Sequence, residues 1–334
     1  MTARVAPVDD HDKAAWTCFV DEHPRAGAMH DFGWRQVLEN AFSVTPVFVA
    51  AKSRTGEVTA VVGAYKARSV FAGHYMATLE DGILYRDDAA YDAVLGCLQD
   101  MAAAEGIPRL CIRNARDCEG PGFETIHADV SLRPSVSELW NGIGKNTQRK
   151  VKQARNEGYT VRCEAPLSHL SAFYGLYARR MRDLGTPVIP YAMFDQIARA
   201  FGPETAKLHL VQQGDDLVGG MICFVDGGAW TNLFVAVPPH LGGANANALL
   251  YWEAIGLARE RGAGSFRLGR SQKDSSTLAF KRKWRPDERP VFNSLYGDGG
   301  PNAHTPLYGA VWKRLPLWVA NAAGPLLRQK LPFG

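Results

Sequence analysis

One order of elements occurs twice along the chain, and this repeat constrains the possible fold more than any other feature of the sequence. Each copy has an expected β-hairpin, a helix that a glycine ends, and a strand that follows the glycine. The members are 47–66, 89–105, Gly106 and 109–113 in the first copy, and 207–225, 246–261, Gly262 and 265–268 in the second. Gly106 and Gly262 lie 156 residues apart, and a chain of 334 residues is long enough for two domains. The sequence therefore predicts two copies of one α/β unit.

Positive charge is concentrated in two short stretches. Residues 141–162 hold six basic side chains and one acidic one, and residues 267–289 hold eight basic and three acidic ones, although the whole chain has a formal net charge of only +4. Two such clusters favour an anionic ligand. The six cysteines form no CxxC pair and the nine histidines form no HxxxH or HExxH motif. We therefore expect reduced thiols, a cytoplasmic location and no metal site.

The second basic cluster surrounds the last strand of the second copy. Gly269 ends an apolar alternation there, which predicts a strand at 265–268 and a polar loop at 270–277. Side chains that could hold an anionic or carbonyl-bearing group follow in close succession: Arg270, Ser271, Lys273, Phe280 and Lys281. The alternative is a solvated basic loop after an edge strand.

The first basic cluster lies on an expected helix between the two copies. Ser135 and Glu138 have the spacing of a capping box, and a second helix is expected at 146–157 with Asn146 as its N-cap. Three basic side chains fall on one face of this helix: Lys145, Arg149 and Lys152. Such a face either binds phosphate or is simply solvated.

The order of elements in each copy resembles the GNAT acyltransferase fold, and two copies in tandem resemble the FemAB family, which transfers aminoacyl groups from tRNA to peptidoglycan precursors. Three stretches carry the likeness: 144–158, 249–269 and the aromatic–lysine pair 280–281. Three others resemble the FemAB-related branch of exosortase and exopolysaccharide loci: 184–188, 269–273 and 312–316. The resemblance implies an α/β fold with two GNAT-like domains, each a mixed, mainly antiparallel sheet flanked by helices. Their expected bounds are 1–134 and 161–300, with a basic helical connector at 135–160 and a basic, aromatic tail at 301–334.

The resemblance also implies an acyltransferase without a bound cofactor. It would move an acyl or aminoacyl group from aminoacyl-tRNA or acyl-CoA to an amine, which attacks directly because no GxSxG nucleophile motif occurs. Lys281 would stabilise the oxyanion, and Asp81 or Glu80 would position or deprotonate the amine, unless these two merely form a turn before Gly82. The expected phosphate-binding residues are Gly242, Gly243, Arg270, Ser271, Lys273, Lys145 and Arg149. The expected substrate contacts are Phe280, Tyr251 and Trp284.

Two other functions stay open. An acyl-CoA-dependent N-acetyltransferase for a small molecule or cell-envelope precursor would hold pyrophosphate at Gly242 and Gly243. A non-catalytic module would bind nucleic acid or polysaccharide through the basic clusters. The basic, aromatic stretch 307–333 suits the inner membrane surface or a lipid-linked acceptor, although Pro316 and Pro325 should interrupt a long amphipathic helix; packing on the domain is the alternative.

Overall fold

The computed structural model describes residues 4–42, 44–69, 73–116, 120–165, 167–297 and 306–329. The chain divides into two compact units. Unit 1 comprises Met1–Glu124, Val291–His304 and Leu326–Gly334, and unit 2 comprises Thr125–Pro290 and Thr305–Pro325. The expected connector at 135–160 therefore falls within unit 2. The part of the expected tail at 301–305 and 330–334 lies outside the described residues.

Unit 1 is built on a mixed sheet with the strand order β1-β2-β3-β4-β6-β13. The strands are β1 (Arg4–Pro7), β2 (Thr45–Lys52), β3 (Val58–Ser69), β4 (Gly73–Thr78), β6 (Arg109–Ile112) and β13 (Asp287–Gly297), and β5 (Leu84–Tyr85) pairs with β3. β4 and β6 run parallel, whereas the other neighbouring strands in this order are antiparallel.

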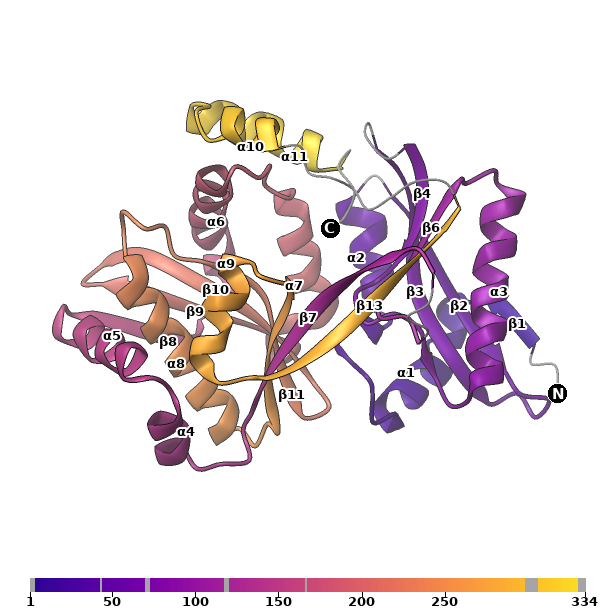
Figure 1. Ribbon diagram of the computed structural model, residues 1–334, viewed down its shortest axis with the longest axis horizontal. Helices are drawn as coiled ribbons and strands as arrows, with labels where there is room; N and C mark the ends of the chain where they lie inside the picture. Colours follow the sequence, from indigo (N-terminus) through magenta and orange to yellow (C-terminus); the bar gives the residue numbers. More distant parts are fainter. Residues whose placement is uncertain are drawn as a thin grey trace. The chain divides into compact units, whose positions relative to one another are not determined.

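Helices cover both faces of the unit 1 sheet, because its strands carry apolar side chains on both sides (Figure 1). These helices are α1 (Lys13–Glu22), α2 (Trp34–Ala41) and α3 (Asp88–Ala104). Val47 and Val49 of β2 share a core cluster with Leu98 of α3. Phe48, which lies between those two valines, instead contacts the ring of Trp16 in α1 at 5.3 Å between centroids.

Unit 2 repeats this arrangement with the strand order β7-β12-β11-β10-β9-β8. The strands are β7 (Gly122–Ser131), β8 (Tyr159–Ala165), β9 (Ala206–Gln213), β10 (Asp216–Asp226), β11 (Ala229–Ala236) and β12 (Ser265–Gln272). As in unit 1, one pair of neighbouring strands is parallel: β11 and β12, which precede and follow the central helix along the chain. The other neighbouring strands are antiparallel.

Strand alternation also separates the two faces of the unit 2 sheet. Cys223 of β10 shares a core cluster with Leu250 of the central helix α8 (Gly243–Glu260) and Val151 of α5 (Lys145–Asn156). The next residue, Phe224, packs at 4.8 Å against Phe201 on the opposite face. The remaining helices are α4 (Val136–Gly142), α6 (Leu170–Leu184), α7 (Tyr191–Thr205), α9 (Ser276–Lys281), α10 (Pro306–Trp312) and α11 (Leu317–Gln329).

Each unit closes its sheet with a strand from the other half of the sequence. In unit 1, β6 pairs with β13, which follows all the other strands along the chain. In unit 2, β12 pairs with β7, which precedes the other strands of that unit. Each sheet is mixed and mainly antiparallel with helices on its faces, which confirms the predicted fold class.

Three local predictions are wrong. The last strand of unit 2 does not end at Gly269, because this glycine adopts a φ of +76° in a β-bulge and β12 continues to Gln272. Helix α5 begins at Lys145 with Gly144 as its N-cap, so Asn146 lies inside the first turn. Pro325 does not end the terminal helix, because α11 runs through it to Gln329.

Candidate active site

The two parallel strands of unit 2 separate beyond their first residues. β11 and β12 pair in register at Ala229–Ser265, Trp230–Phe266 and Thr231–Arg267 only, although both strands continue for several residues. The bulge at Gly269 lies where this pairing stops, and the register between β12 and β7 shifts there. A bulge bends its strand, so the sequence at 268–270 opens the sheet between β11 and β12.

Lys281 extends into this opening. Its side chain is only 5% exposed, and the ammonium donates hydrogen bonds to the carbonyl oxygens of Gly269 (2.8 Å) and Arg270 (2.7 Å). Helix α9 delivers it, because the Ser275 hydroxyl caps that helix and buried Leu278 anchors it. The ammonium and the Asn232 carbonyl oxygen of β11 each lie 3.8 Å from the position that a Cβ of Gly269 would take. A positive charge is thus held in place at the point where the strands diverge.

An aromatic cluster lines the same region. Tyr251 of α8 contacts the rings of Phe280 (5.1 Å, edge-on) and Trp284 (5.7 Å, stacked). Its hydroxyl accepts a hydrogen bond from the Asn232 amide on β11, at 3.0 Å. Burial raises the pKa of Tyr251, so this hydroxyl stays protonated at neutral pH and cannot serve as a base. The structure therefore brings together Lys281 and all three predicted substrate contacts.

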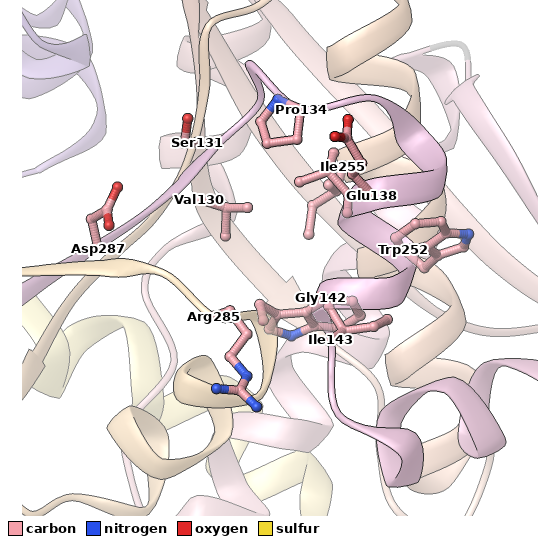
Figure 2. A pocket seen from close by; sticks show the side chains of 12 residues that line it. Val130, Ser131, Pro134, Glu138, Gly142, Ile143, Trp252, Ile255, Arg285 and Asp287 are labelled. Atoms are coloured by element: carbon pink, nitrogen blue, oxygen red, sulfur yellow. The ribbon is translucent and has the colours of Figure 1, made fainter.

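Trp284, which belongs to this ring stack, also lines a pocket of about 300 Å³. The pocket is mainly apolar, and it is formed by the end of β7, by α4, by α8 and by the residues after the 3-10 helix Arg282–Trp284. Figure 2 shows Trp252, Glu138 and Arg285 around it. The indole Nε1 of Trp284 is buried without a hydrogen-bond partner among the described residues. The Ser135 hydroxyl lowers the pKa of Glu138, so this lining carboxylate is negatively charged at neutral pH.

The predicted basic face of the connector helix exists. Lys145, Arg149 and Lys152 are exposed and line a shallow depression on α5, together with Gln148, Gln153 and Asn156. The guanidinium of Arg149 is oriented by hydrogen bonds to the side chains of Gln153 (3.2 Å) and Asn146 (3.0 Å). The opposite side of α5 is buried through Thr147, Val151 and Ala154, which leaves the basic side turned to solvent.

Gly242 and Gly243 stand at the N-terminus of α8, which has no side-chain cap. A side chain would be unfavourable at both positions. A Cβ at Gly242 would come within 2.8 Å of Ala246, and Gly243 has a φ of +58°. The side chain seen to contact this terminus from the end of α5 is Glu157, and not the predicted Lys145 or Arg149. The Glu157 carboxylate accepts hydrogen bonds from the Asn245 amide at 3.2 and 3.3 Å.

The three predicted phosphate-binding residues of the expected loop, Arg270, Ser271 and Lys273, lie on or just after β12. Arg270 is half-buried and opposite His127 of β7, and its carbonyl holds Lys281. The buried Oγ of Ser271 has no partner among the described residues, and Lys273 is exposed. The main chain of Arg270 is therefore part of the Lys281 site.

The acidic pair belongs to unit 1. The carboxylate of Asp81 accepts a hydrogen bond from the Met29 amide (2.8 Å), and Asn114 donates to the Asp81 carbonyl (2.9 Å). Gly82 follows with a φ of +74°. These contacts give Asp81 a part in holding the turn.

Sequence reasoning missed several polar groups that the fold places at these openings. Asn232 interrupts the apolar run of β11, which was its one signal in the sequence. Arg113 is the counterpart of Lys281 in unit 1. It is 5% exposed and donates to the Thr78 carbonyl (2.7 Å) where β4 and β6 stop pairing. Within the described residues, no group of His, Cys, Asp and Glu side chains could hold a metal ion.

Comparison with known proteins supports this architecture. Residues 144–282 match a family model described as an acetyltransferase (GNAT) domain. The crystal structure of FemX aligns with 92% of this chain and 100% of its own, at 15% identity and a TM-score of 0.64. The C-terminal domain of a putative lysylphosphatidylglycerol synthetase from Agrobacterium fabrum aligns with 85% of this chain and 92% of its own, at 13% identity and a TM-score of 0.55.

A third solved structure has the same tandem organisation. It is a tandem GNAT protein from the clavulanic acid biosynthesis pathway, which aligns with 90% of this chain and 100% of its own, at 15% identity and a TM-score of 0.56. A search of curated proteins gave no match. The FemAB-like tandem GNAT fold predicted from the sequence is therefore confirmed, whereas its exosortase-associated branch stays a prediction.

Proposed function

We propose that this chain, an acyltransferase with the FemAB-like tandem GNAT fold, moves an acyl or aminoacyl group from an activated, phosphate-bearing donor to an amine. The observation that carries the proposal is the buried ammonium of Lys281 between the diverging strands β11 and β12. Two backbone carbonyls fix the position of this ammonium. A charge fixed in this way stabilises a developing oxyanion without reorganisation.

The proposed reaction has no covalent enzyme intermediate. The amine nitrogen attacks the donor's carbonyl carbon, a C–N bond forms, and an electron pair moves to the carbonyl oxygen. The electron pair then returns to the carbon, the carbon–oxygen or carbon–sulfur bond to the donor breaks, and the proton lost by the amine passes to the leaving oxygen or sulfur. Lys281 would oppose the negative charge on the carbonyl oxygen. Asp81 and Glu80 stay the candidates for the acceptor amine, although the hydrogen bond from Met29 favours a structural part for Asp81.

Of the two donors, we favour aminoacyl-tRNA. An acyl-CoA would place its pyrophosphate at the uncapped N-terminus of α8, which is a favourable position for an anion. However, the Glu157 carboxylate already contacts Asn245 there, and like charges repel. The basic face of α5 also has Glu157 at its end, where the carboxylate accepts a hydrogen bond from Gln153 (2.9 Å), but its three cations outnumber this one acid and match the phosphates of a polyanion.

We propose further that the pocket beside Trp284 takes an apolar part of the substrate. Its walls include Leu139, Ile143 and Ile255, and also Trp284, whose buried Nε1 has no hydrogen-bond partner in the described part of the chain. Trp284 also stacks on Tyr251, whose ring contacts Phe280 next to Lys281. A substrate group in this pocket would therefore contact Trp284, which belongs to the aromatic cluster next to Lys281.

The direct test is product analysis. The purified chain would be incubated with a panel of aminoacyl-tRNA and acyl-CoA donors and of amine acceptors, and the products identified by mass spectrometry. We expect an amide product with at least one aminoacyl-tRNA, and its loss in Lys281→Met. The matched control is Lys283→Met, because Lys283 is exposed and its ammonium lies over the ring of Phe280, 5.4 Å from the centroid.

Two outcomes would contradict parts of the proposal. Product formation with acyl-CoA alone would move the donor to the α8 terminus and leave the transferase activity standing. Equal activity in Lys281→Met and the wild-type chain would remove Lys281 from the mechanism.

A further inference from the structure

The C-terminal helices α10 and α11 expose large apolar side chains. Val311 is 61% exposed, Trp318 75% and Leu326 65%, whereas the other exposed large apolar side chains of the described residues range from 39% to 48%. On α11, Trp318, Ala322 and Leu326 follow one another at intervals of four residues and so form one apolar stripe along the helix.

The opposite side of these helices is packed, which fixes the direction in which the stripe faces. Trp312 and Ala320 are buried. A Cβ at Gly324 would come within 2.9 Å of the Val188 side chain, and a Cβ at Gly185 within 2.7 Å of the Gly309 carbonyl. The segment therefore lies closely on unit 2, and Val311 and Trp318 remain outside this contact.

The net positive charge of residues 306–329 favours an anionic partner. Residues 306–329 contain no aspartate or glutamate, and they contain Lys313, Arg314 and Arg328. Lys313 and Arg314 are exposed and lie between the two helices, two and three residues after Val311. Exposed tryptophan and aliphatic side chains flanked by cations match the interface of a bilayer that contains anionic lipid.

We infer that this segment docks the protein, by the stripe Trp318–Ala322–Leu326 together with Val311, onto the surface of a membrane with anionic headgroups. The contact lies on the surface and does not cross the bilayer, since none of the described helices is long and apolar enough to span it. The inference depends on the exposure and charge of the tail and not on the transfer reaction. A membrane-bound enzyme of this kind would meet amine acceptors that are themselves lipids or lipid-linked.

Co-sedimentation of the full chain with sucrose-loaded vesicles tests the inference. One vesicle preparation is phosphatidylcholine and the other contains about one part in three phosphatidylglycerol. We expect binding to the anionic vesicles. The triple variant Val311→Ser, Trp318→Ser, Leu326→Ser should lose at least about tenfold in partition. Lys313→Gln with Arg314→Gln should lose about 30-fold at low salt and show a weaker salt dependence.

Val136→Ser is the matched control, because it removes an exposed apolar side chain of α4 and should leave vesicle binding unchanged. Circular dichroism would verify that each variant is folded. Absence of binding to anionic vesicles, or equal binding by the triple variant and the control, would overturn the inference. So would light scattering that shows a dimer of the wild-type chain and a monomer of the triple variant, since the stripe would then join two copies of the chain.

Discussion

Replacing Lys281 by methionine separates a catalytic charge from a structural support. The substitution keeps the length of the side chain but removes the ammonium that bonds to the carbonyls of Gly269 and Arg270. Both residues are half-buried, so the loss of this donor costs at most about 1–3 kcal/mol for each carbonyl. A stable domain has about 5–15 kcal/mol in total, so we expect a folded variant with a clearly lower melting temperature. If the ammonium also faces the oxyanion, turnover should fall about 100-fold or more in the folded enzyme.

The two effects are measured separately. Chemical denaturation gives the change in unfolding free energy, and single-turnover kinetics at a temperature where the variant is fully folded gives the chemical step. Lys283→Met should change turnover less than about fivefold, because a solvated lysine contributes little. A Lys281→Met enzyme that is destabilised yet turns over at the wild-type rate would refute the catalytic role. Lys281 would then have a structural role only, in which its hydrogen bonds to Gly269 and Arg270 stabilise the bend of β12.

Two further predictions concern unit 2. Replacing Lys145, Arg149 and Lys152 by alanine should weaken donor binding and reduce the slope of log affinity against log salt concentration by about 2–3. The control is Arg54→Ala, which removes an exposed cation of unit 1 and should leave donor binding unchanged. An unchanged slope for the triple variant in a filter-binding assay would exclude α5 from the donor site. Burial lowers the pKa of His209 in the folded chain to about 4, whereas an unfolded chain has a histidine pKa of about 6.5. The unfolded chain therefore binds a proton more readily than the folded chain, and the free energy of unfolding decreases as the pH falls from about 6.5 toward 4. From pH 7.5 to pH 5 this loss is about 2 kcal/mol in urea unfolding, and His209→Leu should abolish it; an equal slope in both proteins would contradict the assignment.

The repeat in the sequence predicted the fold because each unit depends on local signals. Gly106 and Gly262 end the central helices, and the hairpins have clear apolar runs. The closing strands β7 and β13 gave no such signal. Each contains several polar or charged residues, and each pairs with a strand far away in the sequence. Long-range pairing of this kind is not encoded in local periodicity, so the sequence pointed to two separate domains where the structure exchanges a strand between halves.

The candidate site was predictable in its residues but not in its geometry. Lys281, Phe280, Tyr251 and Trp284 were all named from the sequence, and the structure brings them together. The ammonium's position was not foreseen, because Gly269 reads as the end of a strand and only its positive φ shows that it is a bulge inside one. Likewise, a capping pattern cannot show that Glu157, rather than a basic residue, contacts the N-terminus of α8.

The exchanged strands lead to a last prediction, about where the chain can be divided. A fragment that begins at residue 135 lacks β7, so it loses six register pairs with β12 and the core side chains Ala128, Val130 and Leu132. Burying valine or leucine contributes about 1.5–3 kcal/mol each, and each lost hydrogen bond about 1 kcal/mol, which together approach the entire stability of a domain. We therefore expect fragment 135–334 to be insoluble or to unfold without cooperativity, whereas fragment 122–334 should unfold cooperatively because it retains the whole sheet of unit 2. Thermal unfolding followed by circular dichroism compares the two. A melting temperature of fragment 135–334 equal to that of fragment 122–334 would show that β12 does not need β7 as its neighbour.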